Sequence, residues 1–238
     1  MKKLLKTLAL TLALALAVTC IFAGCGEGGD DKDSGKGGDS AKVSSYEVLI
    51  ETMEEFRNKK TYYDQTDMQV AFFGGFCEDE MKDYIALQKK SEYYDEESAK
   101  ESFEENIAEN NEMYGSDYKF TCKIVDAQPF TDEDLDMYKD DLKDSAKDME
   151  DELSSYEEDS LSEIAEDMGF TSEDDAQEYL DIMSAVAKKY KNAEITDGYH
   201  LTVEVTLSGS ELEEDEVETE TYTAIKIDGC WAVAEMIF

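Results

Sequence analysis

The chain of 238 residues carries 60 acidic against 22 basic side chains, which gives a formal net charge of −38. This charge excludes nucleic acid as a partner, because binding DNA or RNA requires a cationic surface that displaces counterions. Fourteen tyrosines and ten phenylalanines supply core material, and the single proline, Pro129, leaves long helices unbroken, so the composition also excludes a largely disordered chain.

The first 25 residues predict where the protein resides. Lys2, Lys3 and Lys6 precede an apolar run that extends to Phe22, as in a secretory signal rather than a membrane-spanning helix that is kept. The ending Phe22-Ala23-Gly24-Cys25 resembles the lipobox of bacterial lipoproteins. That resemblance implies removal of residues 1–24 and a lipid on Cys25, which would anchor the chain on the extracytoplasmic face of the cell membrane. A cleaved signal with an incidental Cys25 is the alternative.

Residues 25–42 are expected to join this anchor to the folded body. Residues 26–42 contain six glycines, five acids, three lysines and two serines, but no large apolar side chain. Such a segment buries too little surface to offset the entropy of ordering it, so it is predicted to be a flexible tether. The body is then one extracytoplasmic domain, residues 43–238.

The body is predicted to begin with helices. Apolar side chains recur every three or four residues from Val43 to Lys60, which predicts the first helix. A second is predicted over Asp67–Lys90, with a break at Gly74-Gly75, and a third over Ser98–Tyr114, stopped by Gly115.

A strand and a further helical region follow. Tyr118–Asp126 alternates apolar and polar residues, as a strand does, and Pro129 ends it. Thr131 with an acid three residues later has the form of a capping box. One long helical pattern then extends to Gly169, and Thr171 or Ser172 begins the next helix.

The C-terminal region is predicted to consist of strands. Tyr199–Leu207 alternates, Gly209–Glu216 is an acidic loop, and Val217–Ile227 is rich in β-branched residues. Asp228-Gly229 predicts a two-residue type I′ turn, in which both residues have positive φ. Cys230–Phe238 is expected to return as the last strand.

The segment 225–233, which reads IKIDGCWAV, resembles the closing hairpin of NTF2-like and cystatin-like domains in Gram-positive, clostridial-type surface lipoproteins. The resemblance covers roughly residues 110–238 and, more weakly, the helix at 43–60. It implies an α+β fold in which helices pack on one face of a curved four-stranded antiparallel sheet. Segment 131–191 is longer and more helical than such a fold needs. Most of these lipoproteins have no assigned activity, so the resemblance implies a fold and not a reaction.

The candidate pocket is the concave face of that sheet, with Trp231, Tyr222 and Tyr199 as candidate lining residues. A core role for Trp231 is the alternative, because large aromatic side chains dominate cores. His200, the single histidine, alternates to the opposite face and is expected to be solvated.

No cofactor or metal site is expected. The acidic clusters lack the glycine and the ligand spacing of a calcium loop, and no Cys/His pattern suits zinc. Cys77, Cys122 and Cys230 are an odd number in the body. Two arrangements are possible. One is a single disulfide and one thiol, for instance Cys122 bonded to Cys230 if their strands are neighbours, and the other is three thiols.

We expect a non-enzymatic binding or interaction module held on the membrane by its lipid. Its charge suits a cationic peptide, a basic wall component or a divalent cation. The alternative is an NTF2-like isomerase- or hydrolase-type enzyme with a pocket in the sheet, which needs an accessible cavity that holds an ionisable group. The sequence leaves the ligand and the oligomeric state open.

Overall fold

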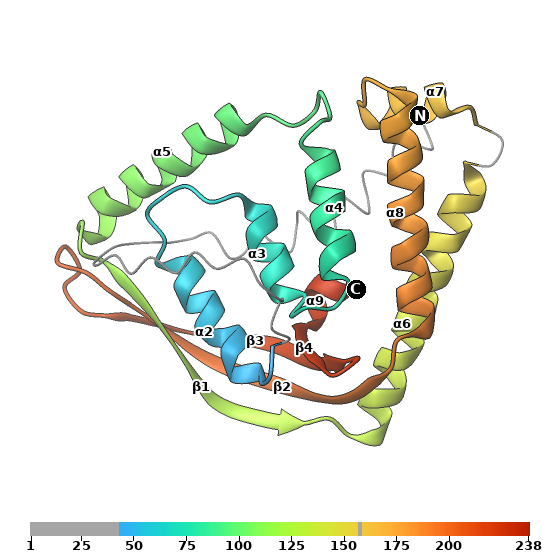
Figure 1. Ribbon diagram of the computed structural model, residues 1–238. Coiled ribbons are helices and arrows are strands. Elements are labelled where there is room, and N and C mark those ends of the chain that lie inside the picture. Colours follow the sequence, from blue (N-terminus) through green and yellow to red (C-terminus); the bar gives the residue numbers. More distant parts are fainter. Residues whose placement is uncertain (1–42, 157–158) are drawn as a thin grey trace.

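A computed structural model describes residues 43–156 and 159–238 of the chain. The predicted signal (1–24), Cys25 and the tether lie outside the described residues. The described part is an α+β structure of eight helices packed with a four-stranded antiparallel open sheet (Figure 1). The helices are α2 (Tyr46–Arg57), α3 (Gln65–Phe72), α4 (Glu78–Gln88), α5 (Glu96–Tyr114), α6 (Asp132–Ser155), α7 (Leu161–Met168), α8 (Glu173–Asn192) and α9 (Ala234–Ile237). The strands are β1 (Lys119–Pro129), β2 (Ile195–Ser208), β3 (Glu216–Ile227) and β4 (Cys230–Val233).

The sheet is a simple meander, because its spatial order β1-β2-β3-β4 is also the chain order. The predicted turn is confirmed: Asp228 and Gly229 have φ angles of 47° and 79° and join β3 to β4. We call the side that carries Leu201 and Val203 the inner face, and the side that carries Thr202 and Glu204 the outer face. The inner-face residues of β2 from Leu201 onward are buried, as their alternation predicts.

Helix α2 lies across the inner face (Figure 1). Its buried side chains are Leu49, Ile50, Met53, Phe56 and Arg57. At its start, the Val43 carbonyl accepts a hydrogen bond from the Trp231 amide in β4 at 3.2 Å. At its end, Asn58 reaches the backbone of β1. The helix therefore spans the sheet from one edge strand to the other.

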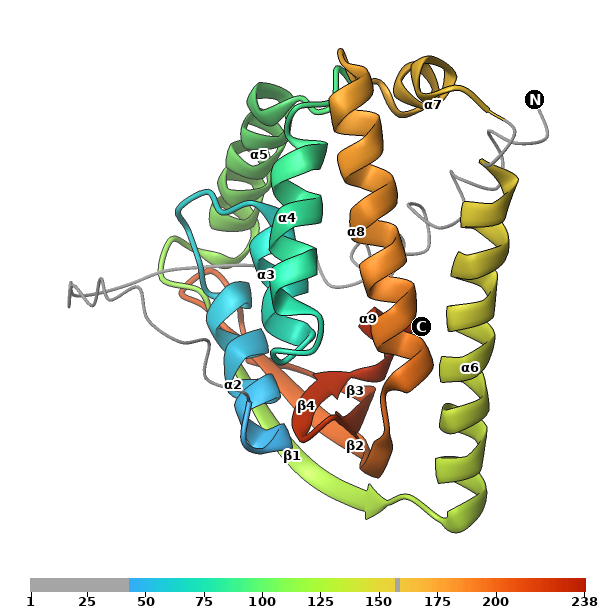
Figure 2. The ribbon, with the colours of Figure 1, turned by 45° about the vertical axis from the view of Figure 1, so that its right-hand side comes forward.

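Not all of the helices lie on the inner face. Helix α6 packs against α8 beside the sheet (Figure 2). The Phe130 ring stacks on Tyr138 of α6 at 4.9 Å and also contacts the His200 ring, which belongs to the outer face, at 4.8 Å. The prediction of helices on one face therefore describes α2, whereas α6 reaches the outer face where β2 begins.

Two predicted elements are wrong in extent. The helix expected to run to Gly169 is divided into α6 and α7, because Ser160 and Glu163 form a second capping box that begins a new helix. The last strand ends at Val233 and gives way to α9. Ala234, Met236 and Ile237 are all buried, a pattern that one side of a strand cannot provide.

The three cysteines of the body form no disulfide with one another. Cys122 lies in β1 and Cys230 in β4, at opposite edges of the sheet, so the pairing that depended on neighbouring strands is wrong. Burial raises the pKa of the Cys77 thiol to about 12 and that of Cys122 to about 11. Both thiols therefore stay protonated near neutral pH, which slows their oxidation and alkylation.

Candidate functional site

Two of the three predicted pocket residues lie together, under the first turn of α2. The Trp231 ring is 5.7 Å from that of Tyr199, and Tyr46 of α2 lies 4.6 Å from Tyr199 and 5.5 Å from Trp231. Trp231 is only 6% exposed. The three rings pack on one another, which is the core arrangement that large aromatic side chains favour.

Tyr222 belongs to a separate polar group further along the inner face. Arg57 Nη2 lies 2.6 Å and 2.9 Å from the two carboxylate oxygens of Glu220 and donates to the Tyr222 hydroxyl at 3.1 Å. The Tyr222 hydroxyl also donates to Glu220. Burial, and next this bond to the carboxylate, raise the pKa of Tyr222.

Arg57 is the sole arginine of the chain and is 6% exposed. Burial alone would lower the pKa of its guanidinium, but the nearby Tyr222 and Glu220 outweigh that effect, and the pKa is raised. Its Nε is buried and has no hydrogen-bond partner among the described residues. The sequence offered one signal of this group, a lone arginine at the end of an amphipathic helix, and none of its partners 163 and 165 residues away.

His200 lies away from both groups. Its Nε2 is 3.7 Å from Asp134 Oδ1, and its side chain is 45% exposed, in agreement with the solvated position expected for it. In the described part of the chain, the His, Cys, Asp and Glu side chains form no group of three that would suit a metal ion.

A surface hollow of about 460 Å³ lies at the turn between α7 and α8. Its lining includes Glu92, Glu166 and Glu173, together with hydroxyl groups such as that of Ser162. It is wide open to solvent and remote from the inner face. Apart from Glu92, its lining comes from residues 162–173, and helical periodicity does not predict that the turn between two helices is hollow.

The two long edges of the sheet differ. On β1, the Asn58 side chain accepts from the Phe120 amide at 2.9 Å and donates to the Phe120 carbonyl at 2.8 Å. Glu54 accepts from the Cys122 amide at 2.7 Å. The strand then shifts register at a bulge between Ile124 and Asp126 and ends at Pro129, which has no amide hydrogen. Side chains and irregular backbone therefore protect this edge.

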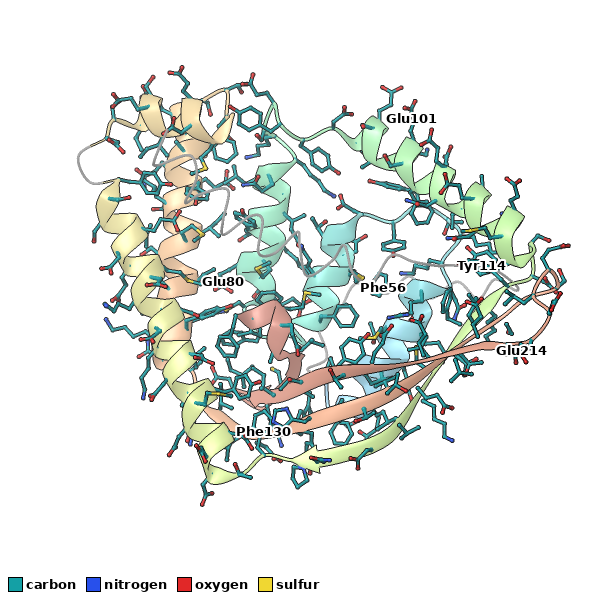
Figure 3. All side chains as sticks on the ribbon, turned by 180° about the vertical axis from the view of Figure 1, so that it is seen from behind. Phe56, Glu80, Glu101, Tyr114, Phe130 and Glu214 are labelled. Carbon is teal, nitrogen blue, oxygen red and sulfur yellow. The ribbon has the colours of Figure 1, made fainter. Side chains whose placement is uncertain are left out.

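The opposite edge is shared by β4 and β3. The four residues of β4 cover only the end of β3, from Ala224 to Ile227. Next to them, the Thr223 amide donates to Glu235 at 3.1 Å. From Glu216 to Thr221, β3 pairs with β2 alone among the described residues. Figure 3 shows Glu214 at the tip of the hairpin that joins these two strands.

Within residues 43–156 and 159–238, the structure contains no helix that is both long enough and apolar enough to cross a bilayer. Comparisons of the chain with protein-family models, with curated proteins and with solved structures find no match.

Proposed function

We propose that this chain is a lipid-anchored extracytoplasmic protein whose body acts as a non-enzymatic interaction module. The observation that carries the proposal is the filled inner face. The rings of Tyr46, Tyr199 and Trp231 and the Arg57–Glu220–Tyr222 group pack against α2, in the region where the alternative enzyme needs a substrate cavity.

Because the inner face is filled, a partner would bind to the outer surface of the protein, which is strongly acidic. Helix α5 illustrates this, because it carries seven glutamates and one lysine. Phe103, Ile107 and Tyr114 are among the side chains that join it to the body. Glu101 projects from it away from the body (Figure 3). A surface of this kind attracts cationic partners such as a basic peptide or a basic wall component, and it repels anionic lipid headgroups.

The anchor itself rests on the segment that ends Ala23-Gly24-Cys25. The relation to NTF2-like and cystatin-like domains is likewise part of the proposal. A helix lying across a four-stranded antiparallel meander and the turn at Asp228-Gly229 support it. In this view α6, α7 and α8 are an added helical block.

Replacement of Cys25 by serine tests the anchor, with Cys20→Ser as the matched control inside the same apolar segment. We expect the unaltered chain and Cys20→Ser to incorporate a labelled fatty acid, to sediment with membranes and to be digested by protease added to intact cells. We expect Cys25→Ser to lose the label and the membrane association that depends on acyl chains. Equal labelling and sedimentation of both variants would contradict the anchor.

Purification of the full chain from detergent-solubilised membranes, followed by mass spectrometry, tests the non-enzymatic function. We expect a protein or wall component to be retained, and to be released by high salt because the attraction is electrostatic. A stoichiometric small organic molecule that resists salt would instead favour the enzyme and its pocket.

A further inference from the structure

The free part of β3 carries backbone groups that point out of the sheet. In a two-residue hairpin, the residues that flank the turn exchange backbone hydrogen bonds, so Ile227 bonds to Cys230. The direction of the backbone groups alternates along a strand, and β3 has no register shift between Glu216 and Lys226. Val217, Thr219 and Thr221 therefore direct their N–H and C=O groups away from β2.

The bond from the Thr223 amide to Glu235 supports this alternation, because Thr223 is the next residue in the same series. The side chains of Val217, Thr219 and Thr221 are exposed, and Val217 is 57% exposed. No backbone hydrogen bond outside the sheet reaches these three residues from the described part of the chain. This edge is thus an accessible row of donors and acceptors about five residues long.

The charged side chains beside these outward backbone groups of β3 are all acidic. Seven acids lie between Glu211 and Glu220, and the chain has no basic residue from Gly209 to Ile225. Glu216, Glu218 and Glu220 share the inner-face side of β3, at successive alternate positions. Arg57 pairs with Glu220, whereas Glu216 and Glu218 are exposed and are joined to no lysine or arginine by an ion pair in the described residues.

We propose that the β3 edge from Val217 to Thr221 binds an extended segment of a partner protein by strand addition, and that this segment carries lysine or arginine at alternate positions. An added strand would satisfy the outward backbone groups. Its side chains on one side would then lie next to Glu216 and Glu218, at the same period of two. The inference rests on the proposed interaction function and identifies the surface that performs it.

The same charges disfavour a second copy of this chain at the edge. In a β3–β3 pair, the glutamates of one copy would lie beside those of the other, and like charges on neighbouring strands repel. A cationic strand converts that repulsion into attraction. The acidic residues thus select among partners as well as preventing self-association.

Titration of the full chain in detergent with a short synthetic peptide tests the proposal. In the probe, lysine and threonine alternate. In the control peptide, the same residues repeat as Lys-Lys-Thr-Thr, so that on either side of the strand each lysine is followed by a threonine two residues later. We expect the alternating peptide to bind at least threefold more tightly, because only its lysines can face Glu216 and Glu218 together along a strand. Equal affinity for the two peptides would overturn the proposal, since it would mean attraction to charge alone.

Two sets of variants locate the binding. Thr219→Pro removes the central outward N–H, and we expect roughly tenfold weaker binding, whereas Thr219→Val should bind as the unaltered chain does. Glu216→Gln with Glu218→Gln should weaken binding about threefold and reduce its salt dependence. Glu104→Gln with Glu105→Gln on the exposed face of α5 changes the net charge equally and should have no such effect.

Unchanged affinity in Thr219→Pro, or equal losses in the β3 and α5 glutamine variants, would overturn the proposal. Dimerisation of the chain that Thr219→Pro abolishes would also overturn it, because the edge would then serve self-association. These outcomes differ from failure of the proposed function. If Cys25→Ser is released from membranes while the alternating peptide fails to bind, the anchored module stands and only this surface is wrong.

Discussion

The two edges of this sheet differ in what lies against their outward backbone groups. On β1, Asn58 and Glu54 of the α2 region bond directly to backbone groups of the strand. On β3, beyond the end of β4, the outward backbone groups are exposed and acidic side chains stand beside them. A hydrogen-bonded edge is closed to any other strand, whereas a charged edge is closed to some strands and open to others. The difference teaches that the α2 region occupies backbone groups of one edge strand, whereas part of β3 stays unpaired on its outer side among the described residues.

Gly74 packs against β4, the short strand that covers one end of the β3 edge. Replacement of Gly74 should therefore have the largest effect on the free energy of unfolding. Gly74 has φ +61°, and a Cβ atom there would lie 1.7 Å from the Trp231 carbonyl oxygen of β4. Because the opposing atom belongs to the backbone, we expect Gly74→Ala to lower the free energy of unfolding by about 3 kcal/mol or more in urea titrations.

Gly229→Ala is the matched control for this replacement. Gly229 also has positive φ, +79°, but a Cβ atom there meets nothing within 4 Å. We expect a loss of about 1 kcal/mol, which is the cost of the backbone conformation alone. Similar losses in the free energy of unfolding in the two variants would mean that close packing of the α3–α4 turn against β4 contributes little to stability.

The sequence predicted local features of this sheet better than its edges. The break at Gly74-Gly75, the Thr131 capping box and the turn at Asp228-Gly229 depend on residues within a few positions of one another, and each is present. The sequence did not indicate that Gly74 lies against Trp231, because that contact joins residues about 160 positions apart and depends on how the whole chain packs.

The candidate site was predictable to a smaller extent. Alternation correctly put Tyr199 and Leu201 on one side of β2, and it put His200 on the other. Alternation does not say what covers a face, so the packing of Tyr46 on Trp231 was not foreseen. A free edge is harder still to predict, because it depends on the length of β4, and the apolar sequence after Val233 gave no sign that the strand ends there.

On the β1 edge, removal of Asn58 should have an intermediate effect. Asn58→Ala leaves both the N–H and the C=O of Phe120 without their side-chain partners. Such loss at a half-buried site costs about 1–3 kcal/mol, and urea titration should show it. Asn106→Ala on α5 removes an exposed bond to a carbonyl of its own helix. It should change the free energy of unfolding by less than about 0.5 kcal/mol; equal effects would mean that Asn58 does not protect β1.

The start of helix α3, which leads to the Gly74 turn against β4, is sensitive to acid. Asp64 caps α3 and forms an ion pair with Lys89 at 2.8 Å. Burial alone would raise the pKa of the Asp64 carboxyl, but hydrogen bonds from Lys89, Thr66 and Tyr94 outweigh it and hold the pKa well below its ordinary value. A lowered pKa stabilises the fold above pH 4, and this contribution is lost as the pH falls below 4.

We therefore expect Asp64→Asn to be less stable than the unaltered chain at pH 7, by about 1–2 kcal/mol, and the two to converge as the pH falls from 4 to 2. Thermal unfolding followed by circular dichroism across this range measures the difference. Asp83→Asn, on the exposed side of α4, should run parallel to the unaltered chain. A constant offset between Asp64→Asn and the unaltered chain down to pH 2 would contradict the lowered pKa.

The smallest effect is expected on the open edge. Proline at an outward position of an edge strand removes an N–H that faces solvent, and such positions are where sheets tolerate proline. Thr219→Pro should therefore change the free energy of unfolding by less than about 1 kcal/mol in urea. Cys122→Pro, on the other edge, removes the amide that donates to Glu54 at 2.7 Å and leaves a half-buried carboxylate without that donor. Its loss should exceed about 2 kcal/mol.

The ratio of these two losses measures the difference between the edges. Equal and large losses would mean that the Thr219 amide already has a partner in the whole chain, and the β3 edge would then be closed as β1 is. Equal and small losses would mean that the bond from Cys122 to Glu54 contributes little, so that β1 would be as open as β3. A large loss of stability in Cys122→Pro together with a small loss in Thr219→Pro would leave β3 as the edge available for an added strand. The reason is that the Thr219 N–H would then have no partner in the isolated chain, and a partner strand could still bind it.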